Sequence, residues 1–194
     1  GGLLALHKSD GSFDGAVAIS LDVHWIDYMM RTSNLPKGAV VAVLADGRRA
    51  LVLQAMGRLF MEPLDDPFRA IQAELAQHSL GAQGSVQAII IDFHAEASSE
   101  KQAMGHSFDG KVSLVIGTHT HVPTADHRIL PGGTAFQTDA GMCGDYDSVI
   151  GMQKGGASIR FWRKVPAERL APAENEATIS GLFVETDDAT GLAR

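Results

Sequence analysis

Three histidines stand just beyond two apolar runs of the sequence. His94 follows VQAIII at 86–91, and the pair His119 and His121 follows VSLVI at 112–116. In an extended segment, residues two apart point to the same side, so His119 and His121 can present two imidazoles to one point. Imidazole nitrogens suit zinc, iron and manganese ions, with carboxylates, amides or water as further ligands. The spacing therefore predicts a divalent transition-metal site formed by His94, His119 and His121.

Carboxylates flank these histidines and could orient them. Asp92, Glu96 and Asp126 are candidates to accept the second ring N–H of a metal-binding histidine. The alternative for each is a carboxylate that caps the next helix or faces solvent. Further candidates for the same crevice, which their sequence positions do not place, are Asp139, Asp145 and Asp147.

The elements around the histidines form a predicted β-α-β unit. Buried strands are expected at 86–91 and 112–116, with a helix at 97–104 between them. Ligands of open α/β sheets bind beyond the carboxyl ends of the strands. Both histidine-bearing loops should therefore open into one crevice.

The remainder of the chain adds further strands and one capped helix. Asp46-Gly47 lies between two apolar runs and indicates an antiparallel hairpin. Asp66-Pro67 precedes Phe68, Ile71 and Leu75, whose spacing predicts an amphipathic helix over 68–78. We expect strands at 15–21, 39–44, 49–56, 135–138, 159–162 and 177–185, followed by a turn at 187–191, all in a single domain over 1–194.

The composition narrows the class of protein. The 194 residues carry a net charge of −7 with scattered positive charges, which argues against bulk binding to nucleic acid. A small phosphate substrate remains compatible, because a bound dication reverses the local field. The single cysteine, Cys143, excludes an intrachain disulfide, and the sequence has neither a signal-type leader nor a membrane-length apolar run. We expect a cytoplasmic protein without membrane contact.

Five segments resemble the YmdB-type branch of the calcineurin-like metallophosphoesterases. They are MGRLFM at 56–61, DDPF at 65–68, DFHAEASSEK at 92–101, GTHTHVPTAD at 117–126 and ILPGGTAFQTDAGMCGDYDSVIG at 129–151. The resemblance implies an α/β fold, a sandwich of two mixed sheets flanked by helices. It also implies hydrolysis of phosphodiesters such as 2′,3′-cyclic nucleotides at a centre of iron, manganese or zinc, with His94, His119 and His121 as ligands.

The same resemblance assigns a general acid and shows departures from the family pattern. The family's GNHxWD motif aligns with Asp22 to Asp27, which makes His24 the candidate proton donor to the leaving oxygen. Val23 stands where the family has a metal-binding asparagine. The GD and GEN motifs, which supply the other ligands, are not found, so we expect an N-terminally truncated form with one or two ions and weakened or altered activity. Apolar surface and a sheet edge left exposed would favour a homo-oligomer.

Two other readings stay open. Gly105 to Asp109 nearly matches the G-x-S-x-G nucleophile elbow, with Ser107 as the nucleophile of a serine esterase. An elbow requires a strand before the serine and a helix after it, the reverse of the order predicted here. The second reading is a binding or structural protein that keeps the scaffold without catalysis.

Overall fold

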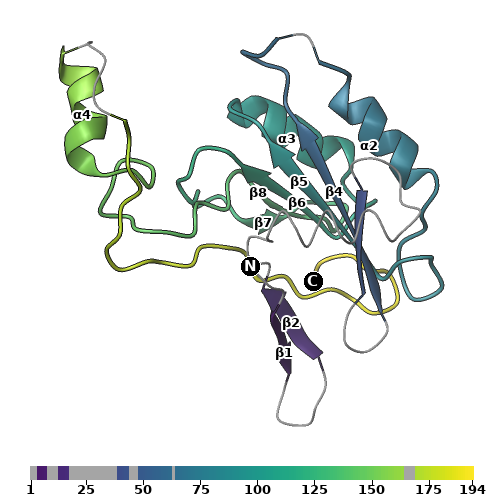
Figure 1. The fold of residues 1–194 in the computed structure, drawn as a ribbon. Helices are drawn as coiled ribbons and strands as arrows, with labels where there is room; N and C mark the ends of the chain where they lie inside the picture. Colours follow the sequence, from purple (N-terminus) through teal and green to yellow (C-terminus); the bar gives the residue numbers. More distant parts are fainter. Residues whose placement is uncertain (1–3, 8–12, 18–38, 44–47, 63, 164–168) are drawn as a thin grey trace.

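The computed structural model describes residues 4–7, 13–17, 39–43, 48–62, 64–163 and 169–194. Its centre is a six-stranded mixed sheet in the order β3-β4-β5-β6-β8-β7 (Figure 1). β4, β5, β6 and β8 run parallel, and the two edge strands run antiparallel to their neighbours. The strands are β3 (Ala39–Val43), β4 (Arg49–Met56), β5 (Ala88–His94), β6 (Leu114–Thr118), β7 (Arg128–Ile129) and β8 (Ala135–Gln137).

The α/β class is confirmed, and so is the predicted β3–β4 hairpin. Within the described residues the second sheet is only the antiparallel pair of β1 (Leu4–His7) and β2 (Phe13–Val17). The predicted strand at 15–21 falls partly in β2, and its remainder lies outside the described residues, as does the whole GNHxWD-like segment with His24. No helix in the described ranges combines the length and the apolar character needed to cross a bilayer.

The core of the sheet is formed by alternate residues of β5 and its neighbours. Ile89, Ile91 and Phe93 are almost fully buried, whereas the residues between them are partly exposed. Successive side chains of a strand point to opposite faces. Asp92 and His94 therefore share the face of β5 opposite Phe93.

Helix α2 (Pro67–Leu75) begins where the sequence predicts and ends three residues earlier than predicted. The Asp66 side chain caps it by accepting hydrogen bonds from the backbone N–H groups of Phe68 (2.9 Å) and Arg69 (3.3 Å). The Phe68 ring packs edge-on against Phe93, with centroids 6.1 Å apart. The cap determines where α2 begins, and the ring contact packs α2 against the sheet.

Helix α3 (Ser98–Ser107) connects β5 to β6, as the β-α-β prediction requires. Met104 and Gly105 are buried against the sheet. A Cβ atom at Gly105 would lie 2.6 Å from the Phe136 ring, so the missing side chain lets α3 approach β8 closely.

The predicted strand at 159–162 is wrong, because these residues belong to helix α4 (Lys154–Arg163). The apolar run that suggested a buried strand is exposed: Phe161 keeps 77% and Trp162 87% of its surface accessible. α4 stands apart from the central sheet (Figure 1), so none of the strands that the structure describes is available to pair with this segment. The expected strand at 177–185 is also wrong, since it is reduced to a single bridge between Thr178 and Gly144.

Candidate functional site

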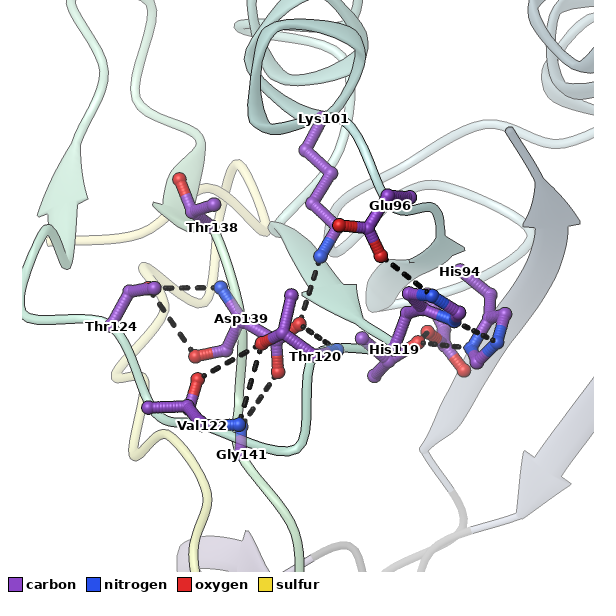
Figure 2. A network of polar contacts seen from close by, with 12 residues as sticks. His94, Glu96, Lys101, His119, Thr120, Val122, Thr124, Thr138, Asp139 and Gly141 are labelled. Atoms are coloured by element: carbon purple, nitrogen blue, oxygen red, sulfur yellow. Dashed lines mark hydrogen bonds and ion pairs between the residues drawn. The ribbon is translucent and has the colours of Figure 1, made fainter. Parts of the chain in front are cut away.

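His94 and His119 meet at the carboxyl edge of the sheet. β5 and β6 are parallel and pair His94 with Thr118, which places His119 one residue beyond. Nε2 of His94 lies 3.1 Å from Nδ1 of His119, and the ring planes are nearly perpendicular at 89° (Figure 2). The two loops therefore converge as expected from the ends of adjacent parallel strands.

A hydrogen-bond chain determines which nitrogen of His94 carries the proton. The Thr118 hydroxyl donates its one proton to Oδ1 of Asp92 at 2.7 Å. At its 3.1 Å contact with Nδ1 of His94 the same hydroxyl can only accept, so Nδ1 is the protonated nitrogen. The Nε2 lone pair of His94 is consequently directed at His119.

The pKa of His94 lies below its ordinary value. Burial is the main cause, since it disfavours the charged ring, and the neighbouring His119 lowers the pKa further. Asp92 acts in the opposite direction without reversing the shift. His94 is therefore held as a neutral ring with a free lone pair, which is the form that binds a metal or accepts a proton.

His119 is held from its other side by Glu96. Nε2 of His119 lies 2.9 Å from a carboxylate oxygen of Glu96, which can only accept, so this nitrogen donates. Nδ1 of His119 faces the lone pair of His94. Two facing lone pairs would repel each other, so this contact is favourable when one nitrogen donates a proton to the other or when both nitrogens bind one metal ion. Two nitrogens bound to one tetrahedral zinc ion would be about 3.3 Å apart, slightly more than the 3.1 Å seen here.

His121 lies apart from this pair. Its Nδ1 contacts the carbonyl oxygen of Ile150 at 3.0 Å; because the carbonyl can only accept, Nδ1 donates and Nε2 keeps its lone pair. The prediction of an extended His119–His121 segment is wrong, since both histidines have positive φ angles, 116° and 66°. In the part of the chain that the structure describes, no three His, Cys, Asp or Glu residues gather as a metal-binding group.

The three carboxylates predicted to orient the histidines make different contacts. Glu96 contacts a histidine directly, and Asp92 acts through the Thr118 hydroxyl. Asp126 instead accepts hydrogen bonds from Thr124 and Thr138, so it joins its loop to the end of β8. Burial raises the pKa of Asp126, but the hydrogen bonds from Thr138 and Thr124 outweigh it and lower the pKa to about 2.

Ser107 does not form a nucleophile elbow. It is the last residue of α3 and is exposed to solvent, whereas an elbow serine lies between a strand and a following helix. The structure therefore gives the serine-esterase reading no geometric support.

A buried ion pair that the sequence does not predict lies beside the histidine loop. Nζ of Lys101 lies 2.8 Å from Oδ2 of Asp139, and each side chain is only 1% exposed. Asp139 is one of the candidates that its sequence position alone does not place, and the sequence assigns Lys101 no role. The sequence contains one signal for this burial, since Lys101 has the spacing that places it on the same helix face as Met104 and Phe108. All three side chains are buried in the structure.

The family model of the YmdB-like proteins matches residues 21–194. The chain belongs to the YmdB-like family. It is 44% identical over 169 residues to the 2′,3′-cyclic-nucleotide 2′-phosphodiesterase of Bacillus subtilis (strain 168), a match that covers 85% of this chain and 62% of the relative. The chain thus spans less than two thirds of that family member.

Two solved structures share the fold. A hypothetical protein from Thermus thermophilus is 42% identical with a TM-score of 0.64, over 73% of this chain and 53% of that one. A novel phosphatase from Mycoplasma pneumoniae is 34% identical with a TM-score of 0.68, over 83% and 56%. The similarity of fold and sequence agrees with membership of the YmdB-like family.

Proposed function

We propose that this protein hydrolyses phosphodiesters, with 2′,3′-cyclic nucleotides as the substrate class, at a divalent-metal centre held by His94, His119 and His121. Family membership and the name of the Bacillus subtilis relative support the reaction. The observation that carries the proposal is the pair of imidazole nitrogens 3.1 Å apart at the carboxyl edge of the sheet, a separation at which one metal ion could bind both. The centre would hold one or two ions of iron, manganese or zinc, the metals that imidazole ligands suit.

His94 and His119 fit such an ion, because Nε2 of His94 and Nδ1 of His119 face each other. Nε2 of His121, which also keeps its lone pair, is the proposed third ligand, although His121 lies apart from the pair in this structure. The other ring nitrogen of each contacts an acceptor, which is the Thr118 hydroxyl, the Glu96 carboxylate or the Ile150 carbonyl respectively. Metal-binding histidines are usually oriented in this way, and the orientation raises their basicity.

When bound, the ion supplies Lewis-acid polarisation of the phosphoryl group and activation of the attacking water. His94 and His119 would hold it at the carboxyl edge, where substrate would have access because the His119 side chain is 43% exposed. Glu96 keeps the outer N–H of His119 engaged and so directs Nδ1 inward. His24, outside the described residues, is proposed to protonate the leaving oxygen.

Hydrolysis of bis-p-nitrophenyl phosphate and of 2′,3′-cyclic AMP tests the proposal. We expect both activities to be abolished by EDTA, restored by Mn²⁺ or Zn²⁺, and reduced at least 100-fold, about 2.7 kcal/mol of transition-state stabilisation, in His94→Asn and His119→Asn. His127→Asn, at an exposed histidine beside β7, is the matched control and should retain activity. EDTA-resistant hydrolysis, or activity that survives both site variants, would reject this function. Metal binding without turnover would favour the non-catalytic reading.

A homo-oligomer is the proposed assembly. The exposed Phe161 and Trp162 of α4 support it, because large apolar side chains grouped on a surface often mark an interface. Light scattering should give a mass above that of one 20.6 kDa chain. A monomer at all concentrations would contradict the assembly and leave the catalytic proposal standing.

A further inference from the structure

We infer that the buried Lys101–Asp139 ion pair is a positioning device that holds the His119–His121 loop in its ligand-presenting conformation. The inference rests on the proposed function only in so far as this loop carries proposed metal ligands. Lys101 extends from α3 toward Asp139, which lies beneath the loop (Figure 2).

Each carboxylate oxygen of Asp139 accepts a hydrogen bond from a backbone N–H group. Oδ2 accepts from Nζ of Lys101 at 2.8 Å and from the N–H of Thr120 at 2.9 Å. Oδ1 accepts from the N–H of Gly141 at 2.9 Å. Burial raises the pKa of Asp139, but the bonds from Lys101, Thr120 and Gly141 lower it overall, so the carboxylate stays ionised.

The held residue lies at the centre of a strained segment. Thr120 separates His119 and His121, whose φ angles of 116° and 66° are uncommon for residues with a side chain. Such conformations persist only where surrounding contacts determine them. The charge-assisted bond to the Thr120 N–H is a contact of this kind, because it fixes the peptide between the two histidines.

Asp139 also holds the far end of the same loop through its main chain. Its carbonyl accepts from the N–H of Thr124 at 3.1 Å, and its N–H donates to the Thr124 hydroxyl at 2.9 Å. The segment from Thr120 to Thr124 is therefore attached at both ends to one residue. Lys101 connects that residue to α3, the helix that directly follows the His94 loop.

Stability alone explains this pair poorly. A buried ion pair contributes little net stability compared with well-packed apolar residues, although removal of one partner is strongly destabilising. The neighbouring Glu100 has a similar task, since its carboxylate accepts from the N–H of Arg58 at 2.8 Å in the loop after β4. Consecutive residues of α3 thus hold two of the loops at the carboxyl edge.

The double variant Lys101→Met/Asp139→Asn separates positioning from stability. It removes both buried charges together, and asparagine has one acceptor oxygen where aspartate uses two, so Thr120 or Gly141 loses its partner. Asp109→Asn is the matched control: Asp109 accepts from the backbone N–H groups of Gly132 and Thr134 before β6 and β8 begin, at the edge of the sheet opposite the histidines. Three quantities are compared with the unaltered chain: melting temperature, Thr120 amide hydrogen exchange, and Zn²⁺ affinity by calorimetry.

We expect the folded double variant to exchange the Thr120 amide at least 10-fold faster and to bind Zn²⁺ 10- to 100-fold more weakly, the range seen when outer partners of ligands are lost. Asp109→Asn should change neither quantity. Unchanged Thr120 protection and Zn²⁺ affinity in the folded double variant would overturn the inference.

Asp139→Glu, which keeps the charge pair but moves the carboxylate, is the second variant, and failure of both variants to fold would equally reject a positioning role. If the unaltered chain binds no Zn²⁺, the proposed function fails, while the Thr120 amide still reports on positioning.

Discussion

Nε2 of His94 lies 3.1 Å from Nδ1 of His119 while the opposite nitrogen of each ring is engaged, by Thr118 for His94 and by Glu96 for His119. When no metal is bound, the contact between the two inner nitrogens is a hydrogen bond in which one nitrogen donates a proton to the other. A metal ion that takes this position must displace that proton.

Metal binding should therefore release a proton and strengthen as the pH rises from about 5 to 8. The lowered pKa of His94 keeps this ring a competent ligand to lower pH than an ordinary histidine. Calorimetric titration with Zn²⁺ in buffers of different ionisation enthalpy measures the released proton directly. Zn²⁺ affinity that is independent of pH over this range would contradict a shared proton.

Thr118→Val should weaken the site with little effect on folding. Valine keeps the shape of threonine but leaves Nδ1 of His94 without its acceptor, so the ring can turn or change tautomer. We expect a 10- to 100-fold loss of Zn²⁺ affinity. Thr178→Val, at an exposed threonine in the C-terminal segment, is the control. Equal affinities in the two variants would show that the Asp92–Thr118 chain does not orient His94.

Gly117→Ala should destabilise the protein. A Cβ atom at this position would lie 1.7 Å from the carbonyl oxygen of Thr138, so the ends of β6 and β8 must separate. Overpacking of this kind costs about 1–3 kcal/mol or more in the free energy of unfolding. Gly155→Ala is the opposite case, because nothing lies within 4 Å of its Cβ and it is in α4, where alanine favours a helix by up to about 1 kcal/mol. Urea denaturation of both variants should give shifts of opposite sign; a neutral Gly117→Ala would contradict the close approach.

Asp126 should contribute stability that is lost in acid. A carboxyl group whose pKa is lowered by folding stabilises the protein above its unfolded pKa, and this contribution disappears as the pH falls through the folded value. For Asp126 the folded pKa is about 2 and the ordinary value is 3.8, which corresponds to roughly 2 kcal/mol at neutral pH. Asp126→Asn should lower the urea midpoint at pH 7, with a difference that shrinks toward about pH 2. Asp147→Asn, whose side chain is 75% exposed, should show a smaller effect at every pH.

Several elements followed from local sequence signals. Asp66-Pro67 set the start of α2, and the apolar runs before His94 and His119 gave two parallel strands with α3 between them. These predictions succeeded because a helix cap and burial periodicity act over a few residues. The strand predicted at 159–162 failed because its apolar residues are exposed on a helix, and composition alone does not tell whether a neighbouring strand is available.

The site divides in the same way. The types and spacing of His94, His119 and His121, and their place after two parallel strands, were decided by the sequence itself, because the ends of parallel strands share one edge of a sheet. The tertiary structure alone decided the proton on Nδ1 of His94, the left-handed backbone of the histidine loop and the Lys101–Asp139 pair beneath it. Each of these depends on contacts between residues 19 to 38 positions apart, whose directions no local pattern specifies.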